Sequence, residues 1–122
     1  MAFINDEVFD QGLDWADVNG TRLDITSTDP GGTYATVTAN TLGNKTIGVT
    51  ATEDADTGTG RQVTVPAITD GSVTGDGTAT HGAIHNATDT VVASGALSSS
   101  QAVTNGNTFT LDEILITIRE PA

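Results

Sequence analysis

The two histidines of this chain, His81 and His85, are the residues whose type and spacing come closest to a metal site. An HxxxH spacing on a helix places two imidazoles on one face, where they can bind zinc. Here Gly82 and the neighbouring threonines favour a strand instead of a helix. Four steps along a strand separate the two side chains by roughly 13 Å, which is too far for one zinc ion. We therefore predict two strand histidines, with no metal ligands and no cofactor.

Asp54 and Asp56 resemble the start of a calcium-binding loop, because oxygen ligands alternate there before Gly58. The bidentate glutamate of an EF-hand is missing at the required spacing, which excludes that motif. Two interpretations stay open: a solvated acidic turn, or a looser calcium site at Asp54 and Asp56 or near Asp70 and Asp76.

No residue set predicts catalysis. The serines at 94 and 98–100 lack the GxSxG frame of a nucleophile elbow. Gly58 and Gly60 are followed by Arg61 without the GK[ST] sequence of a phosphate-binding loop. Carboxylates are so abundant that some pair will lie at glycosidase distance by chance. We expect no enzyme and no catalytic residues.

Charge and composition narrow the class of partner. The chain has 122 residues, a length typical of one domain, with a net charge of −12, four Lys and Arg together and no cysteine. Nucleic-acid binding depends on Lys and Arg displacing counterions, so we expect no nucleic acid and no anionic membrane as a partner. Without cysteine there is no disulfide framework, and no apolar run reaches membrane-spanning length.

Residues 5–18 are the one segment with a helical pattern. Asn5 can cap it, acidic residues occupy its first turn, and Gly20 can end it. Its apolar residues Val8, Phe9, Leu13 and Ala16 fall on roughly one face, with Trp15 beside it. We treat residues 1–20 as an N-terminal arm or helix, which either packs on the domain or docks on a neighbouring subunit.

Residues 21–122 are predicted to form a single β domain. Apolar and polar residues alternate in short segments, which we expect as strands at 23–26, 33–39, 46–52 and 61–65, a hairpin at 78–97, and a last strand at 109–118. The expected connections are a turn at 42–45, Asp-Gly turns at 70–71 and 76–77, a serine connection at 98–100 and an Asn-Gly hairpin at 105–106. The apolar parity changes within the last strand, which predicts a bulge near Asp112 and Glu113. The fold class is all-β: an antiparallel sandwich (jelly-roll or Ig-like) or small barrel, with a short N-terminal helix or arm.

Several stretches together resemble a family of small proteins from the structural gene clusters of tailed bacteriophages. The resemblance covers nearly the whole chain, and its residues are those at 3–13, 19–25, 42–45, 60–73, 77–81, 96–101 and 106–111. One departure is Gly82, where members of this family tend to have a bulky aromatic residue. The resemblance implies a virion component that assembles in the bacterial cytoplasm.

Within that class, the expected role is a decoration or cement protein that binds the capsid exterior. Its partner would be the major capsid protein, and a homo-oligomer such as a trimer would supplement a thin core. Candidate contacts with the capsid or with other subunits are Phe3, Ile4, Phe9, Leu13 and Trp15. One alternative is a tail, neck or fibre component. An alternative of another class is a host-glycan-binding module, in which Trp15 and Tyr34 would stack on sugar rings.

Overall fold

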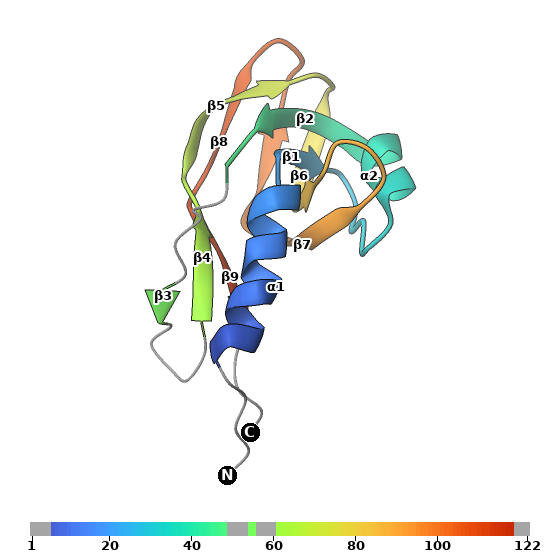
Figure 1. Cartoon of the computed structure of the whole chain (residues 1–122). Coiled ribbons are helices and arrows are strands. Elements are labelled where there is room, and N and C mark those ends of the chain that lie inside the picture. Colours follow the sequence, from blue (N-terminus) through green and yellow to red (C-terminus); the bar gives the residue numbers. More distant parts are fainter. Residues whose placement is uncertain (1–5, 49–53, 56–60, 119–122) are drawn as a thin grey trace.

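The computed structural model describes residues 6–48, 54–55 and 61–118. This part of the chain is mostly antiparallel β, with a six-stranded sheet that curls into a half-barrel and a short N-terminal helix (Figure 1). The predicted all-β class with an N-terminal helix is therefore confirmed.

Two sheets contain the strands. The larger one has the order β7-β6-β1-β2-β5-β8 and the smaller one has the order β3-β4-β9, with every neighbouring pair antiparallel. The strands of the larger sheet are β1 (Arg22–Thr26), β2 (Thr41–Thr46), β5 (Ile68–Val73), β6 (Gly77–His85), β7 (Val91–Val103) and β8 (Thr108–Leu111). Those of the smaller sheet are β3 (Asp54–Ala55), β4 (Arg61–Val65) and β9 (Ile114–Ile118).

The helix α1 (Asp6–Asn19) confirms the prediction for residues 5–18 and lies alongside the smaller sheet (Figure 1). Leu13 and Ala16 on one face are buried, at 1% and 4% exposure. An ion pair of 3.0 Å between Asp10 Oδ1 and Arg61 Nε joins the helix to β4. At the end of α1, the Gly20 N–H donates to the Ala16 carbonyl at 2.7 Å.

A second helix, α2 (Tyr34–Asn40), occupies most of the segment that was predicted as a strand at 33–39, so that prediction was wrong. The tyrosine, valine and threonines of this segment favour a strand locally. In a helix, however, Tyr34 and Val37 are three residues apart and lie on the same face. Val37 is fully buried and the Tyr34 ring contacts the ring of His85. Tertiary packing therefore outweighs the local preference.

The chain between 41 and 52 also differs from expectation. Residues 42–45, predicted as a turn, lie inside β2, where Leu42 and Gly43 are buried. The strand predicted at 46–52 is wrong for Ile47 and Gly48, which follow the end of β2, and its remaining residues lie outside the described part of the chain.

The hairpin predicted at 78–97 is confirmed as β6 and β7, but two predicted turns are wrong. Asp70 and Gly71 lie within β5, at an irregularity of its pairing with β8. A Cβ on residue 71 would come within 2.3 Å of the Phe109 ring, so this glycine permits close packing within the core. Residues 98–100 are part of β7, where residues 97–100 bulge opposite Thr80.

The last part of the chain crosses from one edge of the larger sheet to the other. Residues 105–106 do form a turn, with Gly106 at φ 91°, but the strands on either side do not pair with each other. β7 pairs with β6 and β8 pairs with β5, so the predicted hairpin is wrong. The bulge predicted near Asp112 and Glu113 is also wrong. The change of apolar parity there marks the point where β8 of the larger sheet ends and the chain enters β9 of the smaller sheet.

Candidate functional site

The candidate contact residues of the N-terminal segment lie in different environments. Phe3 and Ile4 are outside the described residues, and Phe9 lies in α1 without a described side chain. Leu13 is part of the hydrophobic core, together with Leu23, Ile25 and other strand residues. Trp15 is 49% exposed.

Trp15 belongs to an exposed apolar stripe of α1, which consists of Val8, Trp15 and Val18. Val8 is 61% exposed and Val18 is 72% exposed. Spacings of seven and ten residues place the three side chains along one side of a helix, away from the side that holds Leu13 and Ala16. The prediction that Val8 shares a face with Leu13 and Ala16 was therefore wrong. The helix therefore has one apolar side in the core and another in solvent.

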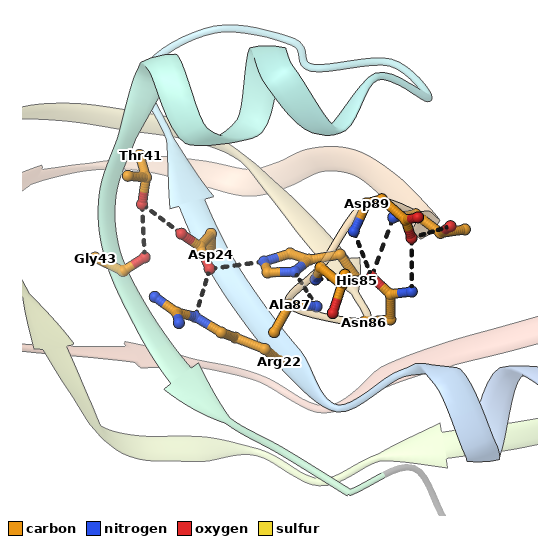
Figure 2. Close-up of polar contacts among 10 residues, drawn as sticks. Arg22, Asp24, Thr41, Gly43, His85, Asn86, Ala87 and Asp89 are labelled. Atoms are coloured by element: carbon orange, nitrogen blue, oxygen red, sulfur yellow. Dashed lines mark hydrogen bonds and ion pairs between the residues drawn. The ribbon is translucent and has the colours of Figure 1, made fainter.

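A buried polar cluster lies under α2, on the sheet face opposite to Leu23 and Ile25, and its centre is Asp24 (Figure 2). Oδ1 of Asp24 accepts hydrogen bonds from Arg22 Nε at 3.2 Å and from His85 Nε2 at 2.8 Å. Oδ2 accepts from the Thr41 hydroxyl at 2.6 Å. The side chains of Asp24 and His85 are 5% and 2% exposed, so these bonds replace the water that burial removes.

The neighbours of His85 determine which ring nitrogen carries its proton. The backbone N–H of Ala87 donates to His85 Nδ1 at 2.9 Å, so Nδ1 is an acceptor and Nε2 is the donor to Asp24. The ring also meets Tyr34 edge to face, with 5.2 Å between ring centroids. Both ring nitrogens are occupied, so the imidazole has no free lone pair with which to take a proton from a substrate. The arrangement links β1, β2, β6 and α2, and fits a structural role.

The turn after His85 is built around the side chain of Asn86. Its Oδ1 accepts from the backbone N–H groups of Thr88, Asp89 and Thr90, at 2.9 to 3.0 Å. Hydrogen bonds from Asn86 Nδ2 and from the Thr90 hydroxyl lower the pKa of Asp89 below its ordinary value of 3.8. This network holds the tight connection between β6 and β7 in one conformation.

The calcium candidates do not converge in the described residues. Asp70 accepts from Lys45 Nζ at 3.0 Å, and Asp76 accepts from the Asn105 N–H at 2.8 Å. Asp54 lies in β3 and pairs with Gln62 of β4, but its side chain is not described. Asp56 lies outside the described residues. Nowhere in residues 6–48, 54–55 and 61–118 do three acidic or histidine residues group in a way that could hold a metal ion.

A groove of about 890 Å³ opens on the inner side of the curled sheet, between β7 and the β8–β9 junction. At one end the two outer strands of the larger sheet are bridged, since Gln101 Nε2 of β7 donates to the Thr110 carbonyl of β8 at 2.9 Å. Elsewhere the strands diverge and leave the groove. Its apolar residues include Leu23, Ile84, Leu97, Ile114 and Ile116, and its charged residues are Asp112 and Glu113.

Gly82 of β6 lies in this groove. A Cβ there would meet only Leu97 Cδ2 at 3.6 Å and the Asp24 carbonyl at 4.0 Å, which are ordinary contacts. The absence of a side chain at this position therefore contributes to the open volume.

Sequence reasoning missed both the polar cluster and the groove. A signal for the cluster was present in the sequence. Asp24 alternates with Leu23 and Ile25 on a short strand, so Asp24 becomes buried if both faces of that strand are covered. The signal for the groove was the absence of charge and proline from residues 91–97 and 114–118. These segments lie in the edge strands β7 and β9, and exposed edge strands usually carry charged residues or proline.

Comparison with protein-family models, with curated proteins and with solved structures found no match for this chain. Neither described helix is both long and apolar enough to span a membrane.

Proposed function

We propose that this chain is a non-enzymatic virion structural protein of a tailed bacteriophage, and that it decorates and stabilises the exterior of the assembled head. The resemblance of its sequence to small proteins of phage structural gene clusters supports the class. The observation that carries a binding role is the exposed stripe of Val8, Trp15 and Val18 on α1. Large apolar side chains gathered on one exposed helix side are typical of a docking surface, and tryptophan is a frequent anchor of such surfaces.

The charge distribution supports a protein partner with a basic surface. Three of the four basic residues form ion pairs within the chain: Arg22 with Asp24, Lys45 with Asp70 and Arg61 with Asp10. The fourth, Arg119, lies outside the described residues. The remaining carboxylates make the surface acidic, which repels nucleic acid and attracts complementary positive charge.

Stabilisation in this proposal is geometric. Each copy contacts adjacent capsid subunits and binds only where the assembled lattice brings them together. Repetition of the contact over the head, or within an oligomer of this chain, strengthens weak individual contacts through multivalency.

The test uses heads purified from a phage that lacks this coding sequence, mixed with purified protein and sedimented. We expect wild-type protein to co-sediment in hundreds of copies per head, whereas Trp15→Ala and Val18→Asp lose most of the binding. Ala35→Asp, a change at an exposed position of α2, adds the same charge as a control and should bind normally. Point substitutions are preferable to removing α1, because Leu13 and Ala16 belong to the core.

The outcomes separate the alternatives. A handful of copies per particle would favour a tail, neck or fibre component, and absence from purified particles would overturn the virion role. The glycan-binding alternative has less support, because the Tyr34 ring is engaged with His85. Binding to a glycan array that Trp15→Ala abolishes would revive it.

A further inference from the structure

The two walls of the groove are strand edges with no partner in the described sheets. β7 is the outer strand of the larger sheet and β9 is the outer strand of the smaller one. Residues 93–96 of β7 pair regularly with β6 on one side, so their other side has backbone groups free for pairing. β9 pairs with β4 along its whole length and is likewise unpaired on its other side.

Bulges in β7 are the one usual protection against further pairing that these two edges carry. Natural edge strands are protected by charged residues, prolines or bulges. Residues 91–97 and 114–118 contain neither charge nor proline, and Leu115 is 48% exposed. The pairing of β7 with β6 shifts register at Val92 and again at residues 97–100, so the regular stretch of this edge is residues 93–96.

We propose that this groove accepts an extended segment of a partner protein, which adds to β7 as a strand. One set of alternate side chains of that segment would be apolar and would cover Ile84 and the open space at Gly82. Main-chain hydrogen bonds to β7 would supply affinity, and the pockets for alternate side chains would supply specificity. The inference rests on the proposed partner-binding function but concerns a different surface from α1.

Charge identifies the chemistry of the occupant. Asp112 and Glu113 are the charged residues of the groove, both are exposed, and neither has an ion pair within the described residues. The occupant therefore carries Lys or Arg at the end that lies beside them. A second copy of this chain fits poorly, because each copy has a net charge of −12 and would bring further acidic residues to the same place.

The test measures binding of three fluorescent peptides by anisotropy. The first has two lysines followed by six alternating valines and threonines. The second has two glutamates in place of the lysines, and the third repeats the first with every backbone nitrogen of the valine–threonine part methylated. We expect the lysine peptide to bind, the glutamate peptide to bind roughly tenfold more weakly at low salt, and the methylated peptide not to bind.

Variants locate the site. Gly82→Phe and Gly95→Phe, at two residues that pair directly and share the groove face, place bulk in the groove. Each should weaken binding of the lysine peptide at least about tenfold, a change of about 1.4 kcal/mol. Gly32→Phe is the matched control, since a Cβ there meets nothing within 4 Å and the residue lies outside the groove. The double variant Asp112→Asn, Glu113→Gln should remove the preference for lysine over glutamate. Circular dichroism and thermal melting check that each variant is folded.

Three results would overturn the inference: no binding of the lysine peptide, equal binding of the methylated peptide, or unchanged binding by both groove variants. Self-association through the groove, seen as a concentration-dependent dimer that Gly82→Phe abolishes, would assign the edge to a second copy and also overturn it. Failure of wild-type protein to bind heads, with peptide binding intact, would overturn only the virion role. Failure of peptide binding with normal head binding would overturn only the groove.

Discussion

His85 donates a hydrogen bond of 2.8 Å to Asp24 across two neighbouring strands, and both side chains are almost completely buried. The backbone N–H of Ala87 occupies the other ring nitrogen of His85, and Arg22 and Thr41 complete the shell of donors around Asp24. A buried carboxylate with this number of donors is tolerated because each donor replaces a lost water molecule. The stability of the larger sheet should therefore depend on both residues.

Replacing Asp24 with alanine should destabilise the fold by about 3 kcal/mol, because three buried or partly buried donors lose their acceptor. Urea denaturation followed by circular dichroism measures the change. Asp14→Ala removes an exposed carboxylate of α1 and should change stability by less than about 0.5 kcal/mol. The double variant Asp24→Ala, His85→Ala should be less destabilised than the sum of the single changes, since the two residues interact directly. Simple additivity would show that the contact contributes nothing.

Replacing Asn86 with alanine should destabilise the β6–β7 connection by about 1–2 kcal/mol, since three backbone N–H groups lose one shared acceptor. Amide hydrogen exchange should accelerate at residues 88–90 first, because they donate to this side chain. Thr88→Ala, at an exposed position of the same turn, is the control, and exchange that is equally fast in both variants would contradict the role of Asn86.

The Asp89 carboxyl should titrate below 3.8, because hydrogen bonds from Asn86 and Thr90 stabilise its ionised form and lower its pKa. The pKa of Asp89 is therefore lower in the folded protein than in the unfolded protein. The stability that its ionised carboxylate contributes is complete at pH values above the unfolded-state pKa, and it is lost as the pH falls through the folded-state pKa. The expected pH window for this loss is therefore below 3.8. An NMR titration of the carboxyl carbon measures the midpoint, which should rise in the Asn86→Ala variant; an unchanged midpoint would exclude Asn86 as the cause.

Gly71→Ala should destabilise the protein by about 1–3 kcal/mol, because the added Cβ would lie 2.3 Å from the buried Phe109 ring. Thermal and urea unfolding measure the change, and Gly48→Ala, where a Cβ meets nothing within 4 Å, is the matched control. In a Phe109→Leu background the alanine should be less destabilising, since the ring that it meets is gone. An equal effect in both backgrounds would place the strain elsewhere.

Local pattern predicted the parts of this fold that depend on neighbours in the sequence. Asn5, the acidic first turn and Gly20 delimited α1 within one residue of its observed ends, and the polar segment between two apolar runs indicated the β6–β7 hairpin. The alternation at residues 61–65 correctly predicted β4 (Arg61–Val65). The all-β class follows from the same alternation of apolar and polar residues.

What the pattern could not predict is which surfaces meet. Residues 34–40 have strand-forming side chains, but the outer face of the larger sheet required a cover for Asp24 and His85, and α2 provides it with Tyr34 and Val37. Asn105-Gly106 has the sequence of a hairpin, yet the chain crosses the sheet there. β8 pairs with β5, and the Phe109 side chain of β8 is buried.

The sequence by itself therefore determined the acidic character, the N-terminal helix, the central hairpin and the β class, all of which depend on composition or on residues close together in the chain. Only the tertiary structure decided the pairing of β5 with β8, the buried Asp24–His85 contact and the groove between β7 and β9. These features join residues distant in sequence, and their free energy comes from burial and long-range pairing, which local periodicity does not encode.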